Sequence, residues 1–130
     1  MEKIKLTIQA KAENIGIARL TTSAVGMKVD FDIDEIEDLK LCVGEACNIL
    51  LEKTTIESED SINIEFTVSD NMDISVSAEK AEPEKEDIKL LTEEGKHNYA
   101  LMIIETLMDG LNFCPEDGIE IKMMKELECN

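Results

Sequence analysis

Aromatic residues are scarce in this sequence: among 130 residues there are one Tyr, three Phe and no Trp. Ile, Leu, Val and Met therefore have to fill most of the hydrophobic core. There is also no apolar run of about 20 residues, the length that a membrane-spanning helix needs. Residues 1–6 alternate polar and apolar side chains, so we expect no signal peptide. These absences predict a cytoplasmic protein with no membrane partner.

Basic residues are few as well, with 13 Lys and Arg against 30 Asp and Glu, which gives a net charge of −17. A chain so acidic repels the phosphates of nucleic acid at long range, so we expect no nucleic-acid partner. The acidic surface suits a basic protein partner. It also serves solubility, and the composition alone leaves these two interpretations open.

The sequence lacks the residue pattern of a zinc site. His97 is the only histidine, and the four cysteines, Cys42, Cys47, Cys114 and Cys129, form no C-x-x-C pair. Cys42 and Cys47 fall within a predicted helix, where cysteine usually acts as a small core residue. We expect all four thiols to be reduced.

Hydrophobic periodicity predicts seven elements. Alternating apolar residues indicate strands over 3–9, 62–68, 72–76 and 119–125. Helical spacing indicates helices over 13–28, 33–53 and 97–111. Segment 79–94 is rich in acids and reads as a loop or lid.

This order of elements favours one domain, residues 1–130, of the α/β (α+β) class. The strands are too few for a doubly wound parallel sheet. We therefore expect a two-layer α/β sandwich in which helices cover one face of a mixed β-sheet.

The helix predicted over 33–53 carries the most information. Either Asp32 or Asp34 can cap its N-terminus, because each is followed three residues later by Glu. Glu45 lies about 130° from the centre of the apolar stripe, so folding does not require an acid there. The stripe itself consists of Ile36, Leu39, Val43, Ala46 and Leu50.

The run Glu45-Ala46-Cys47 resembles the nucleotide-site helix of the RsbW and SpoIIAB anti-sigma serine kinases, and residues 104–109, Ile-Glu-Thr-Leu-Met-Asp, resemble a later helix of that family. The resemblance implies the histidine-kinase-like (GHKL, Bergerat) ATPase fold. It also implies that Glu45 is the general base and that an Asn four residues later holds the magnesium of ATP. Here that position is Ile49, and Asn48 stands one residue early. Asn48 is thus the candidate metal ligand.

Two further motifs of the family differ in this chain. The family's Asp-x-Gly-x-Gly, whose Asp recognises adenine, is replaced by a segment in which only Glu79 offers an acid and no glycine follows. Of the family's glycine-rich turn, which binds phosphate, this chain retains Gly95, next to Lys96. Tyr99 occupies a position at which the family usually has a small residue. The candidate nucleotide-binding residues are therefore Asn48, Glu79, Gly95 and Lys96.

Three interpretations follow. The first is a regulatory protein that binds a sigma factor, an anti-anti-sigma protein or both, forms homodimers as the family does, and needs no cofactor. Arg19, Asp38 and Glu45 are the exposed charges that we would test in it. The second is a kinase that uses Mg-ATP to phosphorylate an antagonist, with Glu45 as base. The third is an α/β domain whose likeness to the family is coincidental.

Overall fold

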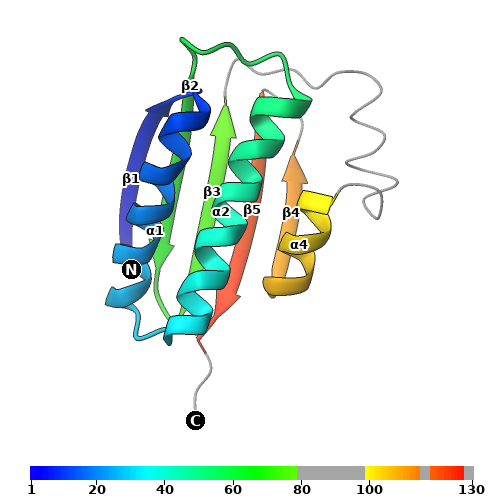
Figure 1. Ribbon diagram of the computed structural model, residues 1–130. Helices are drawn as coiled ribbons and strands as arrows, with labels where there is room; N and C mark the ends of the chain where they lie inside the picture. Colours follow the sequence, from blue (N-terminus) through cyan, green and yellow to red (C-terminus); the bar gives the residue numbers. More distant parts are fainter. Residues whose placement is uncertain (79–98, 115–117, 128–130) are drawn as a thin grey trace.

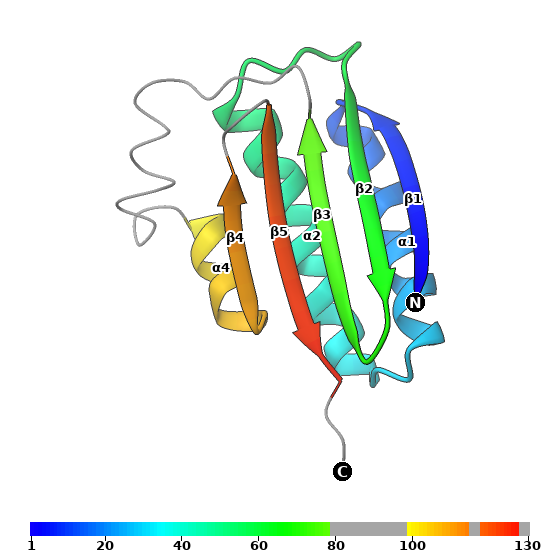
Figure 2. The same ribbon diagram turned by 180° about the vertical axis from the view of Figure 1, so that it is seen from behind.

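The computed structural model describes residues 1–78, 99–114 and 118–127, apart from the side chain of Lys53. These residues form two layers, one of β-strands and one of helices (Figure 1). Seen from behind, none of the helices in the described ranges covers the second face of the sheet (Figure 2). The two-layer α/β sandwich expected from the sequence is therefore confirmed.

The chain passes from the sheet to the helix layer and back twice. It runs β1 (Glu2–Gln9), a 3₁₀ turn η1 (Ala12–Asn14), α1 (Ile15–Lys28), α2 (Ile33–Lys53), β2 (Ser61–Val68), β3 (Asn71–Ala78), α4 (Tyr99–Leu107), β4 (Gly110–Cys114) and β5 (Ile119–Glu126). The strands lie in the order β1-β2-β3-β5-β4. Of the three α-helices among the described residues, α2 lies in the middle and packs against both α1 and α4 (Figure 1).

Strand β4 corrects two expectations. The sequence predicted one helix over 97–111, whereas α4 ends at Leu107 and the chain enters β4 at Gly110. Leu111 satisfies both the helical and the alternating pattern, which is why periodicity extended the helix too far.

The second correction concerns strand direction, since every pairing among the described strands is antiparallel and the sheet is not mixed. A direct β3–α4–β5 crossover would make β5 parallel to β3. Strand β4 adds one reversal, so β5 returns antiparallel between β3 and β4.

The strand register separates the two faces of the sheet. One row of paired residues crosses all five strands toward the helices and is apolar: Ile4, Phe66, Ile74, Met123 and Leu111. The adjacent row points to the open face and is polar: Lys5, Glu65, Ser75, Lys122 and Asn112. This alternation puts the core between the sheet and the helices.

Helix α2 has the bounds that the sequence predicted, 33–53, and Asp32 is its cap. The Asp32 carboxylate accepts a 2.8 Å hydrogen bond from the Glu35 backbone N–H. In return, the Asp32 backbone N–H donates to the Glu35 carboxylate at 3.1 Å. This reciprocal capping box selects Asp32 over Asp34 and fixes where the helix begins.

Helix α1 is apolar on two sides. Its core side is made of small residues, which let it approach α2 closely: Ala18, Thr22, Val25 and Gly26. A Cβ added to Gly26 would lie 3.1 Å from Ile36 of α2. The apolar residues whose spacing predicted this helix lie on the opposite side and are exposed: Ile17, Leu20, Ala24 and Met27.

Candidate functional site

The candidate site lies along the side of α2 that faces α4. The apolar stripe of α2, with Leu39, Val43 and Ala46 at its centre, is fully buried against the sheet. Glu45 is half-buried at the rim of this buried face. Its position matches the expectation that Glu45 lies outside the apolar stripe.

Three elements meet around Cys42. Burial above all, together with the Asp38 and Glu45 carboxylates of the same helix, raises the pKa of the Cys42 thiol to about 12, while Lys125 of β5 opposes this rise. Asp38, Glu45 and Lys125 are thus all close enough to Cys42 to influence the charge of its thiol. The seam between α2, α4 and β5 is thus lined by two carboxylates, one amine and a thiol that stays protonated at neutral pH.

Lys125 also fixes the end of α4. Its Nζ donates a 2.9 Å hydrogen bond to the Leu107 carbonyl oxygen, in the last turn of the helix. A cation at this point satisfies an unpaired carbonyl and opposes the negative end of the helix dipole. The sequence could not show this contact, because 18 residues and strand β4 separate its two partners.

Ile49 and Asn48 lie on different sides of α2. Ile49 is only 2% exposed, so the position that would carry the magnesium-binding Asn presents a buried hydrocarbon. Asn48 is half-exposed, rotated by about 100° from Ile49 around the helix axis. The two residues therefore cannot exchange places without rotating the whole helix.

The other candidate residues lie mostly outside the described chain. Glu79, Gly95 and Lys96 belong to residues 79–98, whose placement the structure does not describe. Tyr99 begins α4 and is 82% exposed, so its ring does not fill the seam between the helices. Of the sequence-predicted nucleotide site, the structure places only Glu45 and Asn48.

Position 49 does not carry the oxygen ligand for the magnesium of ATP that the resemblance implies, since Ile49 is a buried hydrocarbon. Among the described residues, no group of three or more His, Cys, Asp and Glu side chains is placed to hold a metal ion. Magnesium prefers six oxygen donors in octahedral geometry, and the Ile49 side chain supplies none.

Two hollows in the described part of the chain lie on the open face of the sheet, away from Glu45. They have volumes of about 420 and 290 Å³ and share Glu65, Ser75 and Glu120. The Ser75 hydroxyl donates a 2.5 Å hydrogen bond to Glu120, and Glu65 pairs with Lys3 at 3.5 Å. These polar groups satisfy one another, as expected of a solvated sheet face.

The cysteines occupy the places that the sequence suggested. Cys42 and Cys47 are fully buried in α2, and the described cysteines, which also include Cys114, are free thiols. Burial raises the pKa of Cys47 to about 12. No helix among the described residues is long and apolar enough to cross a membrane.

Comparison with known proteins identifies the family. The profile of the histidine kinase-like ATPase domain matches residues 8–125. The chain belongs to this family. It is 31% identical to the serine-protein kinase RsbW of Bacillus mycoides, an alignment that covers 98% of this chain and 86% of the kinase. The RsbW of Bacillus cereus is similar to the same extent.

The fold of this ATPase-family chain also matches a solved structure, that of the RsbU and RsbW domains of a Mycobacterium tuberculosis protein. The TM-score is 0.73 at 14% identity, and the match covers 98% of this chain. The chain spans only 32% of the mycobacterial protein, so this likeness concerns the fold alone. The resemblance to RsbW-type kinases expected from the sequence is confirmed.

Proposed function

We propose that this chain is an anti-sigma-factor-like regulator related to the RsbW-type serine kinases, and that it works mainly by binding other proteins. In this account it takes part in a cytoplasmic partner-switching circuit that regulates bacterial transcription. Its partners are a sigma factor, an anti-anti-sigma protein or both. Its nucleotide site is reduced relative to that of the kinases.

The observation that carries this proposal is the pair Asn48 and Ile49. The resemblance assigns the magnesium ligand to position 49, and the buried Ile49 side chain offers neither an oxygen nor a hydrogen bond. An amide at Asn48 points along a different side of the helix. The magnesium ion of a bound Mg-ATP would thus lack the ligand that α2 supplies in the family.

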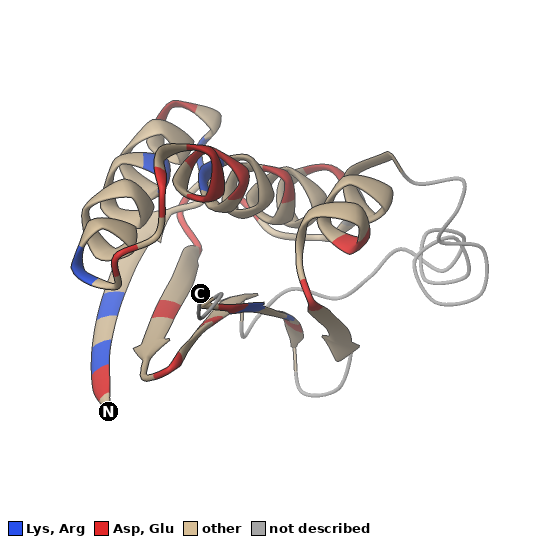
Figure 3. Cartoon of the chain, turned by 90° about the horizontal axis from the view of Figure 1, so that it is seen from below, with Lys and Arg blue, Asp and Glu red and all other residues tan. Residues whose placement is uncertain are grey.

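The charges along the seam support the same proposal. Asp38 and Glu45 are half-buried, and neither forms an ion pair with another described residue. Unneutralised carboxylates repel a triphosphate and attract Lys or Arg side chains. Figure 3 shows acidic residues spaced along α2, in keeping with a basic protein partner.

The alternative function is an active serine kinase that phosphorylates an antagonist protein with Mg-ATP. One observation favours it: Glu45 is half-exposed on α2, where a base can meet a hydroxyl group from outside. As a general base, Glu45 would take the proton of the attacking hydroxyl within hydrogen-bond distance. The RsbW relatives are named serine-protein kinases, which also supports this alternative.

Capture from extracts of the native host tests the binding function. The tagged full-length chain is expected to retain a sigma factor or an anti-anti-sigma protein, and Asp38→Lys with Glu45→Lys should weaken that retention. Glu57→Lys with Glu59→Lys, an equal charge change in the exposed segment after α2, is the matched control. Recovery of neither class of protein would refute the proposal.

Transfer of label from γ-labelled ATP to the captured antagonist distinguishes the two functions. The proposal predicts no transfer above a protein-free control. Transfer that disappears in the Glu45→Gln variant would establish the kinase function instead, because Gln keeps the shape of the side chain and removes the base.

A further inference from the structure

The two outer strands of the described sheet differ in charge. Strand β1 forms one edge and β4 the other, because the strand order is β1-β2-β3-β5-β4 (Figure 2). Strand β1 contains Lys3 and Lys5, which pair with Glu65 of β2 at 3.5 and 3.8 Å. Lysines on an outer strand oppose the addition of a further strand. The β1 edge is thus protected against strand addition.

Strand β4 lacks this protection. Its five residues, Gly110–Cys114, carry no charge, in a chain of which 33% of the residues are charged. The outer side of β4 pairs with no other described strand. Backbone N–H and C=O groups of alternate residues along it therefore point away from the sheet. An uncharged outer strand of this kind is a template to which a further strand can add.

The two faces of β4 determine which side chains an added strand would present. Leu111 and Phe113 are half-buried and continue the apolar rows of the sheet on the helix side, where Leu107 of α4 is also half-buried. Asn112 is exposed and continues the polar row of the open face. A strand added here would thus place apolar residues on the helix side, next to Leu111 and Phe113, and polar residues on the other side.

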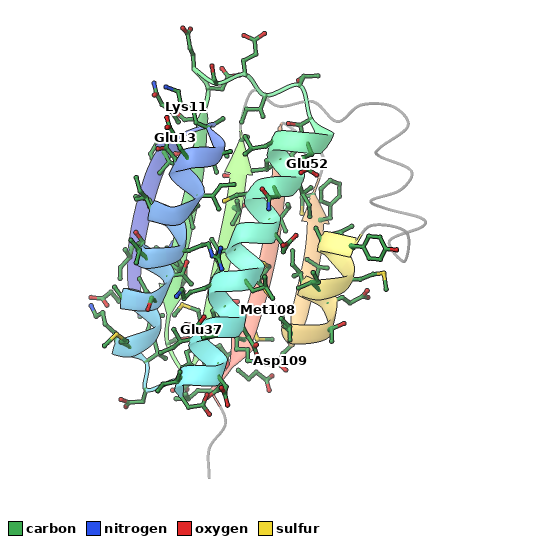
Figure 4. All side chains as sticks on the ribbon, in the orientation of Figure 1. Lys11, Glu13, Glu37, Glu52, Met108 and Asp109 are labelled. Carbon is green, nitrogen blue, oxygen red and sulfur yellow. The ribbon has the colours of Figure 1, made fainter. Side chains whose placement is uncertain are left out.

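The charges next to β4 favour a basic strand. Glu105 of α4 and Asp109, which Figure 4 labels at the bend between α4 and β4, are exposed and form no ion pair with another described residue. Lys122, opposite Asn112 in the register, already pairs with Glu120 at 3.5 Å. A second copy of this chain, with its net charge of −17, would be repelled, whereas a segment with Lys or Arg would be attracted.

We propose that the outer edge of β4 binds a basic, extended segment of another protein, which adds to the sheet as a further strand. In this segment apolar residues alternate with Lys, Arg or uncharged polar residues. Main-chain hydrogen bonds to β4 supply the affinity, and the alternation supplies the specificity. The inference goes beyond the proposed function and does not depend on it, because the β4 edge is a different surface from the seam around Glu45.

Titration of the isotope-labelled chain with a synthetic peptide, followed by the backbone amide signals in NMR spectra, tests the edge. The probe is Lys-Val-Thr-Val-Lys-Val-Thr with both ends blocked. The signals of residues 110–114 should shift saturably and exchange more slowly with solvent, because the peptide covers the outer side of β4. The same peptide with its central amides N-methylated keeps its side chains and charge but loses its donors, and should not bind. Equal binding of both peptides, or shifts confined to other residues, would overturn the inference.

A lysine on β4 should weaken the binding. Asn112→Lys is expected to raise the dissociation constant of the peptide about fivefold or more, because an amine at this edge repels the lysines of the peptide. Asn112 is exposed, so the variant should retain its fold. Gln9→Lys, the matched control, makes a similar change at an exposed position of β1 and should leave binding unchanged. Equal affinities of the Asn112→Lys and wild-type chains would contradict the proposal.

Two further measurements exclude other occupants and other sites. Asp38→Lys with Glu45→Lys should leave peptide binding unchanged, since both residues lie on α2. Loss of binding in this variant would show that the peptide binds the acids of α2, which overturns the inference but not the proposed function. Without peptide, the exchange of the 110–114 amides should not depend on protein concentration. Slower exchange at higher concentration would show that a second copy occupies the edge, and would also overturn the inference.

Discussion

Lys125 of β5 holds the last turn of α4, with its Nζ 2.9 Å from the carbonyl oxygen of Leu107. The bond joins the sheet to the helix that borders the candidate site.

Replacing Lys125 by Met should lower the free energy of unfolding by about 1–2 kcal/mol, since a charge-assisted hydrogen bond and a favourable helix-dipole contact are lost while the aliphatic part is kept. Urea denaturation measures this. Lys122→Met is the control: the Lys122 side chain is 55% exposed and pairs with Glu120 at the surface, so the change in stability should stay within about 0.5 kcal/mol. Equal effects of the two substitutions would show that the contact with Leu107 does not stabilise the chain.

The capping box of α2 leads to a second prediction. Asp32→Ala should destabilise the chain by about 1–2 kcal/mol, because the Glu35 backbone N–H loses its acceptor. Asp34→Ala removes an acid from the same turn without removing the cap and should cost about 0.5 kcal/mol or less. Thermal unfolding compares the stability of the two variants. A larger loss of stability in Asp34→Ala than in Asp32→Ala would show that Asp32 is not the residue that caps α2.

Substitutions at Asn48 and Ile49 should have very different effects on stability. Ile49→Asn puts an amide in an apolar site and should cost about 3 kcal/mol or more. Asn48→Ala should change stability by about 0.5 kcal/mol or less, because Asn48 is half-exposed. Chemical denaturation provides both values. A nearly neutral Ile49→Asn would mean that position 49 tolerates a ligand-type side chain.

The buried thiol of Cys47 predicts a dependence on alkaline pH. Burial raises its pKa from the ordinary 9.0 to about 12 in the folded chain. The folded state therefore keeps its proton between these values while the unfolded state loses it. This thiol's contribution to stability is complete below pH 9 and falls by about 1.4 kcal/mol per pH unit above it.

Denaturation between pH 9 and 11 measures this slope. The Cys47→Ala variant should lose stability with pH less steeply than the wild-type chain by that amount, because the unfolded chain then has one fewer thiol to ionise. Identical slopes in the two proteins would show that the Cys47 thiol is accessible to water.

The sequence predicted the helices that have a clear period. Helix α2 has the predicted bounds because its apolar stripe and its cap agree, although the choice between Asp32 and Asp34 required the backbone geometry. Strand β4 was missed because it has only five residues and follows the helical pattern of α4 directly. That omission also produced the wrong expectation of a mixed sheet.

The candidate site was predictable only where it lies on one element. The positions of Glu45 and Asn48 relative to the apolar stripe follow from helical geometry, and the structure agrees. The environment of Cys42 depends on Lys125, which comes close only once β5 lies in the sheet. The exposure of Ile17 and Leu20 could not be predicted either, since small residues on the other side of α1 form the contact with α2.

Isothermal titration calorimetry of the wild-type chain with Mg-ATP measures the central claim most directly. We predict no saturable binding below millimolar nucleotide, because position 49 offers a buried hydrocarbon where the kinases' pattern has a magnesium ligand. Cooperative unfolding of the same sample would show that it is folded. Binding of one nucleotide per chain at micromolar concentration would contradict the account.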